Sequence, residues 1–245
     1  EIAFWGQKLE NTTVSTILIG GGTPSLLSGE QMETLLQCVR RSFRVEKDAE
    51  ITMEMNPGTV NDKNLIRYKK AGVNRISIGL QSAKNEELQK LGRIHTFQEF
   101  LDTYKAVRAC GFENVNVDLI SAIPGQTRES FEESLHIVAR LEPEHISAYS
   151  LIVEEGTPFY EKYGDGKPKE RDLPSEEEER AMYKRTKEIL EKYGYERYEI
   201  SNYAKDGFAC RHNIGYWERK EYIGVGIGAA SFLGKERFSN IRKID

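Results

Sequence analysis

The stretch that decides the fold class is residues 17–25, Ile-Leu-Ile-Gly-Gly-Gly-Thr-Pro-Ser. Its apolar beginning is typical of a short buried strand, and Ser28 with Gln31 has the spacing of a capping box that opens a helix. Three glycines between strand and helix leave bare backbone that a ligand can touch. A tight turn would also use glycine, but three glycines followed by Thr-Pro favour a ligand-binding loop. The spacing matches neither a phosphate-binding P-loop nor a dinucleotide fingerprint.

Strand-like and helical segments alternate up to about residue 152. The expected strands are 16–20, 50–55, 75–81, 114–120 and 145–152, and the expected helices are 28–43, 61–71, 85–91, 96–110 and 128–141. Repeated βα order predicts parallel strands with right-handed crossovers, either as a barrel or as an open doubly wound sheet.

Polar residues occupy every second position in the central strands, and this pattern favours the barrel. The polar positions are Thr52, Glu54 and Asn56, then Ser77, Gly79 and Gln81, then Asn114, Asn116 and Asp118. Strands of a doubly wound sheet are covered on both faces and are continuously apolar. Five strands do not fill an eightfold barrel, so we expect an α/β fold with a partial TIM-like (β/α) barrel that is open at one side.

The remaining chain predicts a C-terminal α+β extension. We place a partial barrel at 1–165 and the extension at 166–245, with a charged helix over 175–193 that begins at a Ser175/Glu178 capping box. Strand-like residues 195–203, the segment 210–217 and a glycine-rich stretch at 222–234 follow. Within that stretch, residues 224–229 mimic a dinucleotide fingerprint, but no helix follows, so we expect a strand and turn that close the barrel side.

Composition excludes two classes of protein, those that bind nucleic acid and those that span a membrane. The net charge of −4 and pI near 5.8 give nucleic acid no basic surface, and no apolar stretch reaches the roughly 20 residues of a transmembrane segment. We expect a soluble, cytoplasmic protein. The three cysteines lack metal-site spacing; Cys38 and Cys110 lie in amphipathic helical patterns that predict buried thiols, whereas Cys210 stands beside Arg211 and His212.

Ligands of parallel α/β folds bind at the C-terminal ends of the strands. The residues expected there are Gly20 to Thr23, Glu54, Asn56, Gln81, Asp118 and Tyr149. Burial of unpaired polar groups is costly, so their recurrence at successive strand ends indicates a binding site rather than packing. Carboxylates, amides and bare backbone suit a ligand with amino, carboxylate and ribose groups, whereas a phosphate would call for Arg or Lys.

Several motifs in order resemble the radical S-adenosylmethionine (SAM) family of oxygen-independent coproporphyrinogen III oxidases. They are the GGGTPS loop, MEMNPG at 53–58, NRISIGLQS at 74–82, LGRIH at 91–95, NVDLI at 116–120, PGQT at 124–127, EHISAYSL at 144–151 and EEGTP at 154–158. The resemblance runs from about residue 17 to about residue 240. It implies a radical SAM core lacking its first strand.

The C-terminal third is similar to the haem chaperone branch of this family. YEISNYA at 198–204 precedes CRHNIGYW at 210–217, which contains the HNxxYW motif that the branch associates with haem. Without the family, His212 beside Tyr216 and Trp217 predicts either an iron ligand with rings to stack on a macrocycle or a capped turn packed on the barrel.

The resemblance implies three cofactors. SAM would be bound by Gly21, Gly22 and Thr23 through the methionine backbone and by Glu54, Gln81, Arg93 and Asp118 through carboxylate, amino or ribose groups; haem would contact His212, Tyr216 and Trp217. The family also holds a [4Fe-4S] cluster on a CxxxCxxC motif before the glycine loop, but residues 1–15 contain no cysteine. We expect a fragment whose cluster cysteines lie N-terminal to Glu1, with a degenerate member as the alternative, and assign no catalytic residue or metal ligand.

Three functions remain open. The chain belongs either to a haem chaperone that passes haem to an unknown acceptor protein, or to an oxidase that converts porphyrinogen propionates to vinyls. The third is a barrel enzyme unrelated to SAM, with Glu54 and Asp118 as paired acid and base. The HNxxYW motif favours the chaperone over the oxidase.

Overall fold

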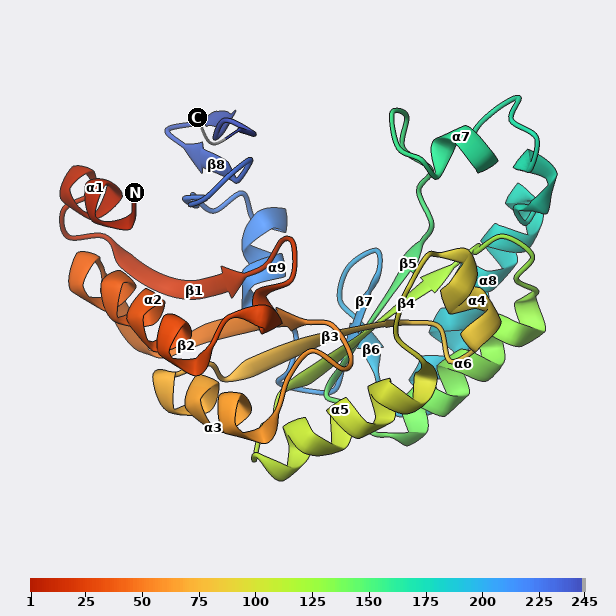
Figure 1. Ribbon diagram of the computed structural model, residues 1–245, viewed down its shortest axis with the longest axis horizontal. Helices are drawn as coiled ribbons and strands as arrows, with labels where there is room; N and C mark the ends of the chain where they lie inside the picture. Colours follow the sequence, from red (N-terminus) through yellow and green to blue (C-terminus); the bar gives the residue numbers. More distant parts are fainter. Residues whose placement is uncertain (244–245) are drawn as a thin grey trace.

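A curled sheet of seven strands dominates the computed structural model, which describes residues 1–243 (Figure 1). In spatial order β1-β2-β3-β4-β5-β7-β6, the first five strands are parallel, β7 is antiparallel to β5, and β6 is antiparallel to β7. The strands are β1 (Thr13–Ile19), β2 (Arg44–Met55), β3 (Arg75–Gln81), β4 (Val115–Ser121), β5 (His145–Ser150), β6 (Glu196–Arg197) and β7 (Asn202–Ala204). The predicted α/β partial barrel is confirmed.

Helices cover the convex face of this sheet (Figure 1). The helices of the chain are α1 (Ile2–Lys8), α2 (Gly29–Ser42), α3 (Asp62–Ala71), α4 (Asn85–Lys90), α5 (Phe97–Ala109), α6 (Arg128–Arg140), α7 (Tyr160–Tyr163), α8 (Glu176–Glu191) and α9 (Arg211–Trp217). The predicted capping box at Ser28 is present, because its side chain accepts from Gln31 N while the Gln31 side chain accepts from Ser28 N. No helix of residues 1–243 is long and apolar enough to cross a membrane.

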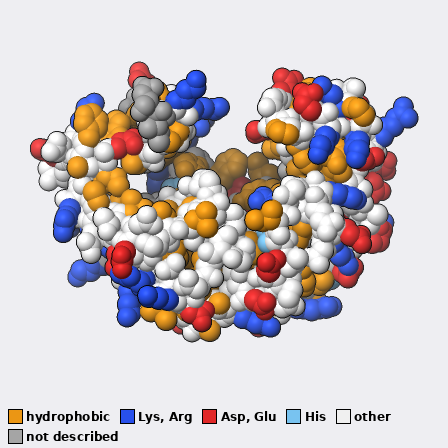
Figure 2. Space-filling model, in the orientation of Figure 1, with side chains coloured by type: hydrophobic (Ala, Val, Ile, Leu, Met, Phe, Trp, Pro, Cys, Tyr) orange, Lys and Arg blue, Asp and Glu red, His pale blue; other side chains and the backbone are white. Residues whose placement is uncertain are grey.

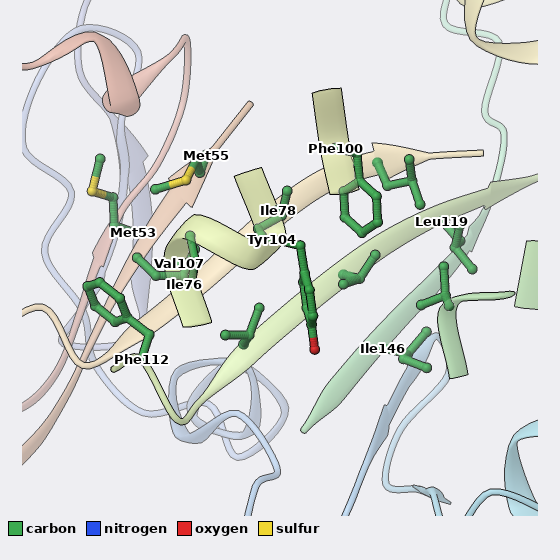
Figure 3. Packing of buried hydrophobic residues seen from close by; sticks show 14 of the residues in the cluster. Met53, Met55, Ile76, Ile78, Phe100, Tyr104, Val107, Phe112, Leu119 and Ile146 are labelled. Atoms are coloured by element: carbon green, nitrogen blue, oxygen red, sulfur yellow. The ribbon is translucent and has the colours of Figure 1, made fainter. Parts of the chain in front are cut away.

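The hydrophobic core lies between the sheet and α2, α3, α5, α6 and α8 (Figure 3). Met53, Ile76, Ile78, Val117 and their apolar neighbours on β2 to β4 are fully buried there. Because side chains alternate across a strand, the polar residues of the same strands face the concave side. The core therefore forms on one face, and the other face is left for polar chemistry.

The C-terminal segments differ from expectation in two places. Residues 195–203 do not form one strand but contribute β6 and the start of β7. Residues 226–228 form a turn, and the following hairpin of β8 (Ala230–Leu233) and β9 (Glu236–Ser239) packs on α1 instead of closing the barrel side. The Trp5 and Phe238 rings stack with centroids 6.0 Å apart, and Gly226 N donates to Glu1 Oε2 over 2.9 Å. The predicted boundary near residue 165 stays a prediction.

The cysteines also differ from expectation. Cys38 and Cys110 are half-buried rather than buried, because Cys38 flanks the buried stripe of α2 and Cys110 lies at the C-terminal cap of α5. Cys210 is the buried thiol, with 2% of its surface exposed. Its burial comes from contact with a strand that is distant in the sequence.

Candidate functional site

A cavity of about 240 Å³ lies at the C-terminal ends of the central strands. It is lined by Gly22, Pro24, Glu54, Met55, Asn56, Ser77, Gly79, Gln81, Arg93 and Asp118. We call it the strand-end cavity. Figure 2 shows that this face of the molecule is hollowed between two raised flanks. Of the residues predicted for SAM, five line this cavity, and Gly21 and Thr23 adjoin it through Gly22.

The glycine loop and Glu54 hold each other in place. Gly21 N donates to Glu54 Oε2 over 3.0 Å. Gly21 and Gly22 have φ angles of +77° and +58°, and no heavy atom lies within 4 Å of where their Cβ atoms would be. Both positions require glycine, and they present bare backbone to the cavity. Thr23 Oγ1 accepts from Asn56 Nδ2 over 3.3 Å, which ties the loop to the end of β2.

Gln81 reaches the cavity through an irregularity in β3. The β3–β4 register shifts between Gly79 and Gln81, and Gln81 has a φ of +75°. Such a bulge re-aims a side chain, and a non-glycine residue in the left-handed region is strained. A Cβ at Gly79 would lie 2.9 Å from Gln81 Nε2, so the glycine makes room for the amide.

Arg93 enters from the loop after α4, and His95 anchors that loop. His95 is buried, and its Nε2 donates to the Leu80 carbonyl over 3.1 Å, at the end of β3. Burial lowers the pKa of His95, so the ring is neutral near pH 7. Arg93 thereby brings one cation to a cavity that also contains the carboxylates of Glu54 and Asp118.

Asp118 is held by its neighbours on the polar face. Its Oδ1 accepts from Asn116 Nδ2 over 2.7 Å, and its Oδ2 accepts from Ser77 Oγ over 3.2 Å. Burial raises the pKa of Asp118, while hydrogen bonds from Asn116, Ser147 and Ser77 oppose that rise. The carboxylate is therefore oriented before any ligand arrives.

The segment that carries the HNxxYW motif forms α9, which packs against β1 and β2. Glu50 of β2 caps this helix: Arg211 N donates to Glu50 Oε2 over 2.9 Å, and His212 N donates to Glu50 Oε1 over 3.0 Å. The Cys210 thiol also donates to Glu50 Oε1, over 3.2 Å. A carboxylate at a helix N-terminus is favourable, which explains how Glu50 can be buried.

The His212 ring uses both of its nitrogens. Thr16 Oγ1 lies 2.9 Å from Nδ1, and Tyr216 Oη lies 2.9 Å from Nε2. Burial lowers the pKa of His212, so the ring is neutral near pH 7. Tyr216 and Trp217 are exposed over 45% and 57% of their surfaces. The rings could stack on a macrocycle, but His212 can ligate iron only if Nε2 leaves Tyr216.

The cysteines do not meet in space. They lie on α2, after α5 and before α9, and in residues 1–243 no three His, Cys, Asp or Glu side chains converge to hold a metal ion. The residues present do not fit an iron–sulfur cluster. They fit SAM, because the strand-end cavity combines bare backbone, two carboxylates, an amide and one guanidinium.

Several contributors were not assigned from the sequence. Ser77 lines the cavity, and the alternation of polar residues along β3 was the signal that could have identified it; Asn56 was expected at its strand end and does line the cavity. Glu50 and Tyr198 offered no such signal. Their partner Cys210 lies 160 and 12 residues further along the chain, and only the fold brings them together.

Comparison with known proteins gives consistent matches. The profile of the family described as "Radical SAM superfamily" matches residues 3–138. The chain is 44% identical to the heme chaperone HemW of Escherichia coli over 88% of its own length, and 40% identical to that of Lactococcus lactis over 96%. It spans 55% and 61% of those two relatives. The solved coproporphyrinogen III oxidase HemN of E. coli, a radical SAM enzyme, superposes with a TM-score of 0.83 at 26% identity, covering 99% of this chain and 58% of that one.

Proposed function

Because this chain belongs to the radical SAM superfamily, we propose that its strand-end cavity binds S-adenosylmethionine. The backbone of Gly21 and Gly22 with Thr23 faces the methionine part. Glu54, Gln81, Arg93 and Asp118 take the amino, carboxylate and ribose groups. A barrel enzyme unrelated to SAM is at odds with this family membership.

The composition of the cavity carries this proposal. Among the lining residues that the structure describes, Arg93 is the one cation, and the others include two carboxylates, an amide and a glycine of the loop. An ammonium group pairs with a carboxylate, a ligand carboxylate pairs with a guanidinium, and ribose hydroxyls donate to a carboxylate. SAM presents all three of these groups, and a phosphate ligand would be repelled by Glu54 and Asp118.

We further propose that the chain is part of a haem chaperone that binds haem at α9 and passes it to an acceptor protein. The relatives named heme chaperone and the exposed rings of α9 support this function. Oxidative decarboxylation of coproporphyrinogen is the second candidate, supported by the likeness to HemN. In the assembled protein, the cluster would supply the redox chemistry.

Calorimetry with S-adenosylhomocysteine, a stable analogue, tests the SAM site. We expect Asp118→Asn and Glu54→Gln each to weaken binding about ten-fold, which is the loss of one charge-assisted hydrogen bond. Glu129→Gln, on the exposed first turn of α6, is the matched control and should bind as the parent chain does. Absence of binding by the parent chain would contradict the proposal.

Titration with hemin tests the haem site. Binding should shift the Soret band, and His212→Ala should remove the shift. Cys210→Ser separates the neighbouring thiol from the imidazole as iron ligand, and Trp217→Ala tests stacking. If His212→Ala bound hemin unchanged, His212 would be a structural turn residue and the preference for the chaperone would lose its support from this site.

A further inference from the structure

A chain of hydrogen bonds runs along the concave face from the strand-end cavity toward α9. It begins at Asp118, which accepts from Asn116 Nδ2. The same amide nitrogen donates to Ser77 Oγ over 2.7 Å. Asn116 is 2% exposed, so water does not compete for these bonds. The orientation of the Asn116 amide therefore sets the orientation of the Asp118 carboxylate.

His145, at the start of β5, extends this series of hydrogen bonds from Asn116 to Tyr198. Its Nδ1 lies 2.6 Å from Asn116 Oδ1, and its Nε2 lies 2.8 Å from Tyr198 Oη. An amide oxygen only accepts, so Nδ1 carries the proton. The neutral ring then accepts at Nε2, and Tyr198 donates its hydroxyl proton there.

The environment of His145 keeps that proton order fixed. The side chain has no exposed surface, and burial together with the positive charge of Arg75 holds the pKa of His145 well below its usual range. With the ring neutral, only one direction of donation satisfies Asn116 and Tyr198 together. The imidazole thus joins two specific partners, one on each side.

The series of hydrogen bonds ends at the N-terminus of α9. Tyr198 Oη accepts from the backbone N–H of Cys210 over 3.3 Å. Cys210 is the residue that precedes α9, and Glu50 holds the same turn from the other side. A displacement of α9 would therefore move Tyr198, and through His145 it would move Asn116 and Asp118.

We propose that His145 is a positioning residue shared by the strand-end cavity and α9, which makes binding at the two sites cooperative. This inference rests on the proposed function. A ribose hydroxyl donated to Asp118 favours the arrangement in which Asn116, His145 and Tyr198 are aligned, and that arrangement holds the start of α9. An adenosyl ligand should therefore tighten porphyrin binding about five-fold, and porphyrin should tighten adenosyl binding equally.

Tyr198→Phe is the sharpest test, because it removes the one hydroxyl that joins His145 to Cys210 and keeps the ring. Hemin affinity is measured with and without saturating S-adenosylhomocysteine. The parent chain should show the five-fold difference, and Tyr198→Phe should lose it while binding each probe alone as before. Tyr195→Phe is the matched control, since its buried hydroxyl donates to the Pro143 carbonyl over 2.6 Å, outside the chain of bonds. Provided that both probes bind the parent chain, an equal difference in Tyr198→Phe, or none in the parent chain, would overturn the proposal.

A second measurement needs no ligand. Amide hydrogen exchange at residues 210–213 should be several-fold faster in Asn116→Ala than in the parent chain. Without the Asn116 side chain, His145 loses a hydrogen bond, and Tyr198 then holds the start of α9 less firmly. Asn114→Ala, two residues earlier, is the control and should not change it. Equal exchange in both variants would overturn the proposal even if both probes bind. Failure of S-adenosylhomocysteine to bind, with exchange as expected, would instead contradict the proposed function alone.

Discussion

Gly20 and Glu54 exclude any side chain between them: a Cβ atom on Gly20 would lie 2.8 Å from Glu54 Cδ and 2.9 Å from its Oε2. Real Cβ atoms do not approach other atoms so closely, so the glycine is what allows the carboxylate to reach the neighbouring strand end. Gly20 thus leaves room for the Glu54 side chain, whereas Gly21 and Gly22 allow the left-handed backbone conformation of the loop.

Gly20→Ala should accordingly weaken S-adenosylhomocysteine binding about ten-fold, since Glu54 must swing away and lose its bond to Gly21. Calorimetry measures the change. Gly215→Ala in α9 is the control, because a Cβ there would meet only Lys220 at 3.8 Å or more. Unchanged affinity in Gly20→Ala would show that Glu54 takes no part in binding.

Three histidines with lowered pKa values predict a loss of stability in mild acid. The pKa values of His95, His145 and His212 are all lowered, mainly by burial. Below about pH 6.5 these histidines bind protons in the unfolded chain but not in the folded chain, so the free energy of unfolding falls as pH falls. Each histidine contributes up to about 1.4 kcal/mol per pH unit.

Urea unfolding between pH 7.5 and 5.5 checks this slope. His145→Gln should reduce it by up to about 1.4 kcal/mol per pH unit. Gln98→Ala on the exposed side of α5 should leave the slope as it is. A free energy of unfolding that stays constant or rises toward pH 5.5 would contradict the prediction.

Removal of the Arg75 charge should increase the stability of the protein. It is 3% exposed, its Nε has no hydrogen-bond partner, and no ion pair of Arg75 is found in the described part of the chain. A buried charge without a partner costs stability, so Arg75→Met should raise the free energy of unfolding by about 1 kcal/mol or more.

Removal of this charge should also raise the pKa values of His145 and His212, because Arg75 lowers both. NMR titration of the imidazoles measures that effect separately from stability. Arg40→Met on the exposed side of α2 is the control and should leave both pKa values unchanged. A fall in either value would be the opposite of the expected sign.

Tyr216→Phe should increase hemin affinity about five-fold. It frees Nε2 of His212 from a hydrogen bond worth about 1 kcal/mol and keeps the aromatic ring. Tyr222→Phe, whose ring meets Tyr216 edge to face at 4.8 Å, is the control in the Soret titration. Weaker binding in Tyr216→Phe would show that its hydroxyl contacts the porphyrin or orients His212.

The alternation of polar and apolar residues along β2 to β4 was enough to predict the sheet, its polar face and most of the cavity, because side-chain direction in a strand is a local property. The strain at Gln81 was not predictable, since the bulge depends on the register with β4. Nor was the burial of Cys210, because Glu50 lies 160 residues earlier and no local pattern relates the two. Local periodicity cannot report contacts that form only when distant parts of the chain fold together.

That separation has a consequence for the order in which the protein matures. At about 5 to 20 residues per second, the ribosome delivers Cys210 roughly ten to thirty seconds after Glu50. During that interval the Glu50 carboxylate has no helix to cap, and its bonds to Arg211 and His212 do not exist. Docking of α9 is therefore a late event in biosynthesis. A nascent chain that stalls before residue 210 leaves the Glu50 carboxylate uncovered, whereas the finished protein buries it.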